Sequence, residues 1–278
     1  MKKILQTDEF YVGYIPSAPD KTSVFIKKII FAGATLLTIV AAALALNQKQ
    51  FSPTDFEYGV NTTLAGLLVK SPVPHLRISL GKNLEGKELF QMVLLVGSGK
   101  HGADDLIEKK FVSMVTIRGY LIYGDGKAIL QINDASDITP NDRNVTNSEL
   151  RNESFSKAET ISVTGEITDP KCYFGVMKPG EGKTHRSCAI RCIAGGIPPV
   201  LKSNTSDYFL LVNENFESLN ADVLPIVGDM VSLDGEVVEL DGWKILKVKA
   251  KKIKDLTRST QQRKMLIAMD AEMTFCSH

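Results

Sequence analysis

Few cysteines and almost no excess charge characterise this chain. Its 278 residues include only four cysteines, too few for the dense disulfide framework that stabilises small secreted scaffolds. The net charge is +1, so the chain lacks the basic surplus that attracts nucleic acids and other polyanions. A content of 44% hydrophobic and 23% charged residues excludes a wholly disordered chain. The sequence therefore describes a folded protein in which cysteine and histidine are scarce.

One long uncharged run interrupts the globular pattern. Residues 29–46, IIFAGATLLTIVAAALAL, carry no charged side chain, and apolar residues continue back to Val24 across two lysines. About 20 helical residues cross the hydrocarbon core of a bilayer, and lysines at its edge can extend to the headgroups. We therefore predict a transmembrane helix over residues 24–46. A cleaved signal peptide is the alternative, although its apolar core is usually only about 7 to 15 residues long.

The residues on either side of this helix predict its orientation. Residues 1–28 contain five lysines, whereas the first twenty residues after the span contain only Lys49. The positive side of a membrane protein stays inside, so we expect the tail, residues 1–23, in the cytoplasm. Residues 47–278 are then extracytoplasmic, which in a bacterium means periplasmic. Thiols are readily oxidised in that compartment.

Strand patterns dominate the exported part, so the predicted fold class is mostly β. From Leu76 onward, runs of β-branched and aromatic residues alternate with glycine and aspartate turns. The predicted parts are a linker at 47–72, a first β module at 73–137, a polar linker at 138–158, a second β module at 159–254, and a helical C-terminal tail at 255–278.

Two eighteen-residue segments resemble copies of one hairpin. VTIRGYLIYGDGKAILQI (115–132) aligns without gaps with VSLDGEVVELDGWKILKV (231–248), and the match includes Gly119 with Gly235 and both Asp-Gly turns. We infer an internal duplication. In the second module, strands are expected at 160–168, 172–177, 208–213, 229–239 and 243–250. Five such strands resemble the OB-fold, a five-stranded Greek-key barrel. That resemblance implies a fold and no particular function.

Three of the four cysteines and one histidine lie within residues 172–192, CYFGVMKPGEGKTHRSCAIRC. Three thiolates and an imidazole can form a closed tetrahedral zinc site, so the predicted metal ligands are Cys172, His185, Cys188 and Cys192. Copper is the other suspected metal, because cysteine, histidine and methionine are its soft ligands and Met177 lies nearby. The cysteine pair at 188 and 192 resembles that of the binuclear copper site of cytochrome oxidases. The histidine and methionine that follow in that motif are absent here.

Two hypotheses explain the same residues without a metal. A disulfide from Cys172 to Cys188 or Cys192 would close a loop of roughly 16 to 20 residues and add on the order of 3 kcal/mol. Alternatively, Cys188 acts as a nucleophile with His185 as its base, and Lys183 and Arg186 favour its thiolate. No third group that would orient the base is visible in the sequence.

The first module contains a similar short motif. GSGKH (97–101) matches the G-x-G-K pattern of GEGKTH (180–185), although it lacks the further residues of a phosphate-binding P-loop. A second loop that faces the first would explain the likeness. We interpret His101 itself as an exposed side chain on a glycine-lysine turn.

The membrane helix and the cysteine cluster together predict a function. We expect a membrane-anchored, extracytoplasmic metal-binding accessory or electron-transfer subunit of a membrane redox or respiratory system, with no catalytic activity of its own. Its expected partners are the membrane and other membrane or periplasmic proteins of such a complex, and no nucleic acid. The alternatives are a non-catalytic assembly or docking protein with a disulfide-pinned loop, and a thiol-dependent enzyme that uses Cys188 and His185.

Overall fold

The computed structural model of the chain describes residues 19–48, 54–107, 113–141, 155–205, 207–249 and 253–256. The chain divides into two compact units, residues 1–50 and 51–278, and each is described by itself. The tail up to residue 18 lies outside the described residues. So does the segment from residue 257 onward, which holds most of the predicted C-terminal helix and Cys276.

The apolar run near the N-terminus is helical, as predicted. Helix α1, Asp20–Asn47, contains the whole predicted span 24–46. Thr35 and Thr38 donate their hydroxyl hydrogens to backbone carbonyls one turn earlier, at 2.8 and 2.9 Å, so neither polar group is left unpaired on an apolar helix. The helix is long and apolar enough to span a membrane, a property that a signal sequence shares.

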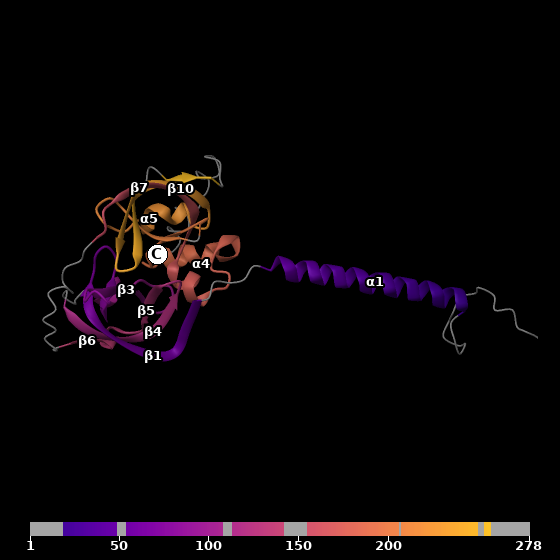
Figure 1. Cartoon of the computed structure of the whole chain (residues 1–278), viewed down its shortest axis with the longest axis horizontal. Helices are drawn as coiled ribbons and strands as arrows, with labels where there is room; N and C mark the ends of the chain where they lie inside the picture. Colours follow the sequence, from indigo (N-terminus) through magenta and orange to yellow (C-terminus); the bar gives the residue numbers. More distant parts are fainter. Residues whose placement is uncertain are drawn as a thin grey trace, which may run out of the picture. The chain divides into compact units, whose positions relative to one another are not determined.

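The second unit is mostly β and contains two closed five-stranded barrels (Figure 1). The first has the strand order β1-β2-β3-β5-β4, and β4 closes it by pairing with β1. The second has the order β7-β8-β9-β11-β10, closed by β10 on β7. In each barrel the third and fifth strands run parallel and the other neighbours antiparallel. The strands are β1 Thr54–Val69, β2 His75–Lys82, β3 Glu88–Gly97, β4 Met114–Gly124, β5 Lys127–Ile132, β7 Glu159–Thr168, β8 Val200–Ser203, β9 Tyr208–Val212, β10 Met230–Leu240 and β11 Trp243–Val248.

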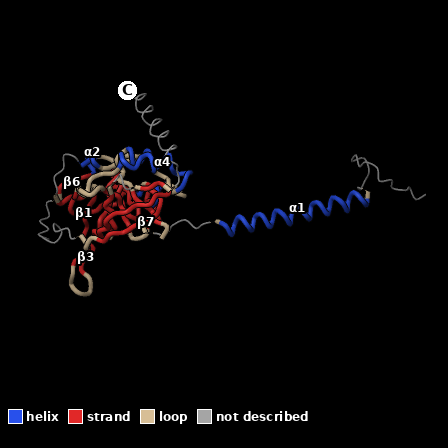
Figure 2. Tube along the Cα trace, turned by 90° about the horizontal axis from the view of Figure 1, so that it is seen from above, coloured by secondary structure: helices blue, strands red, loops and turns tan. Residues whose placement is uncertain are grey.

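Short elements complete the two barrels, and Figure 2 shows helices α2 and α4 at the edge of the strands. Two small strands extend the sheets by pairing with β4 and β10. These small strands and the short helices are β6 Ile138–Pro140, β12 Lys254–Asp255, α2 Asp104–Ile107, α4 Gly182–Ala194, α5 Asn220–Val223, the 3₁₀ helices η1 Ala135–Asp137 and η3 Leu224–Ile226, and the π-helix η2 Cys172–Val176.

The two hairpins that the sequence aligns occupy the same place in the two barrels. Hairpin β4–β5 supplies the fourth and fifth strands of the first barrel, and β10–β11 supplies those of the second. Both Asp-Gly turns have positive φ at both residues, 49° and 70° at Asp125-Gly126 and 45° and 88° at Asp241-Gly242. Such angles define the tight type I′ turn that suits the twist of a hairpin. The equivalent hairpins and strand orders support an internal duplication.

The glycines shared by the two hairpins allow the neighbouring strands of each hairpin to lie close together. A Cβ atom on Gly119 would lie 2.3 Å from the carbonyl oxygen of Gln131, and one on Gly235 would lie 2.4 Å from that of Lys247. Real Cβ atoms essentially never approach a backbone oxygen so closely. A side chain at either position therefore forces β4 away from β5, or β10 away from β11.

Gly235→Ala is expected to destabilise the second barrel. Overpacking of this kind typically costs about 1–3 kcal/mol, because backbone must move to accept the methyl group. Chemical unfolding of the full chain in detergent, followed by circular dichroism, measures the change. Glu239→Gln on the exposed face of the same strand is the matched control and should leave the free energy of unfolding nearly unchanged. Equal stability of the two variants would contradict the close packing.

The predicted linker at 47–72 is wrong over residues 54–69, which form β1. The polar residues that indicated a linker lie on the half-exposed first part of this strand, which pairs with β4 from Thr54 onward. Only its last four residues, Gly66–Val69, are continuously buried. The first barrel therefore begins at Thr54 and not at residue 73. The predicted polar linker at 138–158 begins with a strand too, since Ile138–Pro140 is β6, while residues 142–154 lie outside the described part.

The strand predicted at 172–177 is also wrong. Residues Cys172–Val176 form the π-helix η2, because the Asp169 carboxylate accepts the backbone N–H of Cys172 at 2.8 Å and turns the chain. The second strand of this barrel is β8, which lies between the strands expected at 172–177 and 208–213, where no strand was expected. The other four expected strands are present as β7, β9, β10 and β11.

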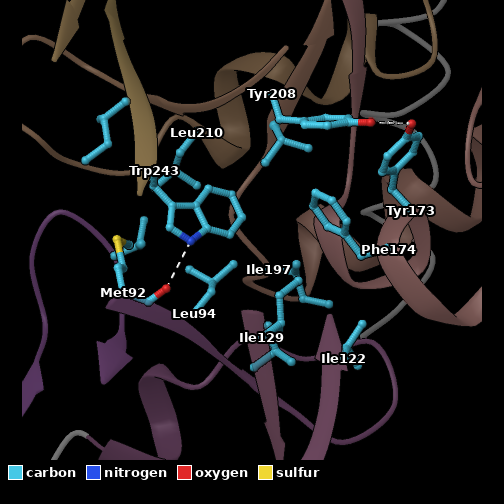
Figure 3. Close-up of a cluster of buried hydrophobic side chains, with 14 of the residues drawn as sticks. Met92, Leu94, Ile122, Ile129, Tyr173, Phe174, Ile197, Tyr208, Leu210 and Trp243 are labelled. Carbon is cyan, nitrogen blue, oxygen red and sulfur yellow. Dashed lines mark hydrogen bonds between the residues drawn. The ribbon is translucent and has the colours of Figure 1, made fainter. Parts of the chain in front are cut away.

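One hydrophobic core spans both barrels (Figure 3). Met92 and Ile129 of the first barrel pack with Trp243 of the second and with Phe174 of η2. Trp243, 1% exposed, donates its indole N–H to the carbonyl oxygen of Met92 at 3.1 Å. An ion pair of 2.6 Å between Arg77 and Asp241 crosses the same interface. The two barrels are thus held together by apolar packing and by directional bonds.

Candidate metal centre

All four predicted ligands lie in the connection between β7 and β8, residues 169–199. Cys172 begins the π-helix η2, and the other three ligands are on helix α4, Gly182–Ala194. Spacings of three and four residues place His185, Cys188 and Cys192 along one face of this helix. The equivalent connection of the first barrel, residues 70–74, is short and has no cysteine or histidine.

The Cys172 sulfur lies at a ligand-like distance from each of the other two cysteine sulfurs, although the four predicted ligands do not all lie within 4.8 Å of one another. The Sγ atom of Cys172 lies 3.7 Å from that of Cys188 and 3.8 Å from that of Cys192. In a tetrahedral site with metal–sulfur bonds of about 2.3 Å, the ligand sulfurs lie about 3.8 Å apart. Ligand atoms of Cys172, His185 and Cys188 all lie within 4.8 Å of one another. The three cysteines are free thiols, and those of Cys172 and Cys192 are buried.

The ring of His185 is oriented so that one nitrogen is left for a ligand. The residue is 1% exposed, and its Nδ1 lies 3.3 Å from the hydroxyl oxygen of Thr168. That hydroxyl donates to the carbonyl oxygen of Gly180 at 3.0 Å. The Nε2 atom is buried without a hydrogen bond. The partner of one ring nitrogen decides which nitrogen binds a metal, so this arrangement favours binding through Nε2.

Asp169 is a site residue that the sequence analysis did not identify. Its Oδ2 atom is buried without a hydrogen bond and lies 3.3 Å from His185 Nε2. A carboxylate oxygen of Asp169 also lies within 4.8 Å of the sulfurs of Cys172 and Cys192. Burial raises the pKa of this carboxyl group. The signal in the sequence was the Asp-Pro pair at residues 169–170, shortly before Cys172.

Lys100 of the first barrel reaches the same sulfurs. Its Nζ donates to Cys188 Sγ at 2.7 Å and lies 4.0 Å from Cys192 Sγ. The hydrogen bond to the Cys188 sulfur raises the pKa of Lys100. The motif at 97–101 therefore faces the ligand segment through its lysine, while His101 is exposed as expected.

The positive charges expected next to Cys188 lie elsewhere. Lys183 is exposed on α4, and Arg186 forms an ion pair of 2.6 Å with Asp229. Sequence proximity suggested these two residues, but the helix turns them away from the sulfurs. The cation that lies beside the Cys188 sulfur is Lys100, at 2.7 Å.

The pKa values of the side chains in this site shift in different directions. The hydrogen bond with Cys192, together with burial, raises the pKa of the Cys172 thiol. The same hydrogen bond lowers the pKa of Cys192. Burial lowers the pKa of His185, so its ring is neutral at pH 7, as a metal ligand must be. The site thus holds a neutral imidazole beside sulfurs that ionise unequally.

No relative supplies a function for these residues. No protein-family model matches the chain, and no curated protein or solved structure is significantly similar to it. The chemistry of the donor atoms and their geometry are therefore the basis for assigning a role.

Proposed function

We propose that this chain binds one zinc or copper ion through Cys172, His185, Cys188 and Cys192. We further propose that it serves as a membrane-anchored, extracytoplasmic accessory subunit of a redox or respiratory complex. The spacing of 3.7 and 3.8 Å between the cysteine sulfurs carries the metal-binding part of the proposal. The buried His185 Nε2, which has no hydrogen bond, supports a fourth ligand.

The donor set fits a closed site for a single metal ion better than a site with an open coordination position or a centre with several metal ions. Four protein ligands leave no position for a substrate, which is the pattern of structural zinc. A soft thiolate set equally suits copper, which would add electron transfer to the role. In a [4Fe–4S] cluster each cysteine binds a different iron, so the cysteine sulfurs lie farther apart than those of Cys172 and Cys188.

The barrels support a binding role for this connection. We infer that both are OB-folds, because each is a five-stranded barrel in which the fourth strand closes onto the first. The connection between the first and second strands of an OB-fold is one of its usual ligand-binding loops. The metal ligands of the second barrel lie in that connection, between β7 and β8.

We propose that α1 is not cleaved and anchors the chain in the membrane, which places the candidate metal site outside the cytoplasm. The 28 residues and apolar composition of this helix are the support for a membrane anchor. With the lysine-rich tail inside, the barrels face the outside of the cytoplasmic membrane. We expect the chain to stay in the membrane during alkaline extraction. We also expect protease added from outside to reach the barrels. A soluble chain that starts after residue 47 would instead indicate a cleaved signal sequence.

Metal analysis of the purified chain tests the proposed site. The full chain is purified in detergent without oxygen, and metal content and alkylation of thiols are measured together. We expect about one zinc or copper ion per chain, the stoichiometry of a closed four-ligand site, with the three cluster thiols protected until a chelator is added. A metal-free chain with a mapped disulfide from Cys172 would reject the proposal.

Thiol chemistry is the second candidate function. Cys188 is only half-buried, and the ammonium group of Lys100 lies 2.7 Å from its sulfur. A neighbouring cation stabilises a thiolate, which is the nucleophilic form of cysteine. A metal-free chain in which Cys188 alone reacts rapidly with an alkylating reagent would favour this function over metal binding.

A further inference from the structure

The first barrel brings one loop to the sulfur cluster of the second barrel. This loop, residues 97–102, follows strand β3 and carries Lys100. Among the described residues, no carboxylate forms an ion pair with Lys100. Its ammonium group donates to the Cys188 sulfur at 2.7 Å and lies 4.0 Å from the Cys192 sulfur. Lysine usually pairs with a carboxylate, so the contact of Lys100 with a cysteine sulfur suggests that this lysine serves the cysteine cluster.

Several close contacts hold this loop in place. Lys171, 2% exposed, donates to the carbonyl oxygens of Gly97 and Gly99, both at 2.7 Å. The backbone N–H of Gly102 donates to the carbonyl oxygen of Gly195 at 2.8 Å. A Cβ atom on Gly195 would lie 1.9 Å from the carbonyl oxygen of Lys100, so only glycine permits this approach. The position of Lys100 is therefore set by the end of α4 and by the residue next to Cys172.

We infer that Lys100 is a positioning residue of the metal centre, holding the Cys188 sulfur in the ligand set and balancing its charge. The inference rests on the metal binding proposed above. A divalent ion with three thiolates and a neutral imidazole carries one net negative charge. Leaving a buried charge without a partner is costly, and one ammonium group removes that cost. Monovalent copper with two thiolates and one thiol carries the same net charge.

The role assigned to Lys100 explains three sequence features together. The motif GSGKH forms the loop, the glycine pair at 195 and 196 gives it room, and Lys171 next to Cys172 anchors it. The first barrel thereby completes a site whose ligands all belong to the second barrel. A chain that lacks the first barrel would hold all four ligands without this charge partner.

Affinity measurements on the full chain test the inference. Zn²⁺ affinity is measured by competition with a chromophoric chelator for the wild type, Lys100→Gln, Lys100→Arg and Lys183→Gln. Loss of a residue that contacts metal ligands typically lowers affinity about 10- to 100-fold, and we expect this for Lys100→Gln. Lys100→Arg keeps the charge and should retain most of the affinity. The control Lys183→Gln removes an exposed lysine of α4 and should match the wild type.

The absorption spectrum of the Co²⁺-loaded chain separates a role at the sulfur from a general structural role. A thiolate that loses an N–H donor gives up electrons more easily, so the sulfur-to-cobalt charge-transfer band of Lys100→Gln should move to lower energy. Lower affinity with an unchanged band would overturn the inference, as would wild-type affinity in Lys100→Gln. A wild-type chain that takes up neither Zn²⁺ nor Co²⁺ would instead reject the proposed metal site itself.

Discussion

Cys172→Ser is expected to leave the purified chain without its metal ion. The Cys172 sulfur lies within 4 Å of both other cluster sulfurs, at 3.7 and 3.8 Å, and it is the ligand that does not come from α4. Without it, the remaining ligands lie along one face of a single helix and cannot surround an ion. If free metal stands at about 1,000 times its Kd, the stabilisation lost is about 4 kcal/mol. Metal content and the unfolding midpoint, measured on the same sample, check both effects.

His101→Ala is the matched control for this experiment. It removes a potential metal ligand of the facing loop whose side chain is exposed, and it should keep the metal and the stability of the wild type. His185→Gln tests the fourth ligand in the same way and should weaken binding without abolishing the sulfur contacts. A Cys172→Ser chain that retains one ion per chain would contradict the assigned ligand set.

Trp243→Ala is expected to cost about 3–5 kcal/mol of unfolding free energy, the usual range for deleting a large buried aromatic side chain. Trp243 is 1% exposed and packs in the core shared by the two barrels, close to Phe174. The variant leaves a cavity there and removes the indole donor from the carbonyl of Met92. Urea unfolding of the full chain, followed by circular dichroism, measures the loss.

Trp243→Phe separates the hydrogen bond from the packing. The phenyl ring fills much of the space but leaves the Met92 carbonyl without its donor, which costs about 1–3 kcal/mol. The chain has one tryptophan, so wild-type fluorescence reports on this interface alone. An alanine variant as stable as the phenylalanine variant would show that the ring adds nothing to the packing between the barrels.

The parts of the fold that were predictable are those specified by residues close in sequence. An uncharged run long enough to cross a bilayer indicated α1, and the Asp-Gly turns with their flanking strands indicated both hairpins. Strand β1 was missed because its first half is polar and half-exposed, and its strand conformation depends on pairing with β4. Helix α4 was missed because the glycine at its first position, Gly182 with φ of 77°, is typical of a loop.

In the candidate site, too, features set by residues close in sequence were predictable, and features set by distant contacts were not. Residue type and spacing were enough to select Cys172, His185, Cys188 and Cys192 as possible ligands. The fold brings the ligand atoms of Cys172, His185 and Cys188 within 4.8 Å of one another, and places the Cys192 sulfur 3.8 Å from the Cys172 sulfur. Lys100 lies 88 positions from Cys188. The shared G-x-G-K pattern suggested that the two loops face each other, but it did not indicate a contact between this lysine and a cysteine sulfur. Asp169 was missed for a different reason: its carboxylate shapes the turn into η2 as well as facing the cluster, and only the first role was visible in an Asp-Pro pair.

The unequal connections of the two barrels bear on how such a site could arise. If the barrels descend from one unit, the first keeps a short link at 70–74 where the second carries residues 169–199. In that case the first barrel has the short connection of the common unit, and the second barrel has gained an insertion. Phe174 and Ile197 of the inserted segment now fill the core that joins the barrels. Deleting this segment would therefore remove core packing between the barrels as well as the candidate ligands.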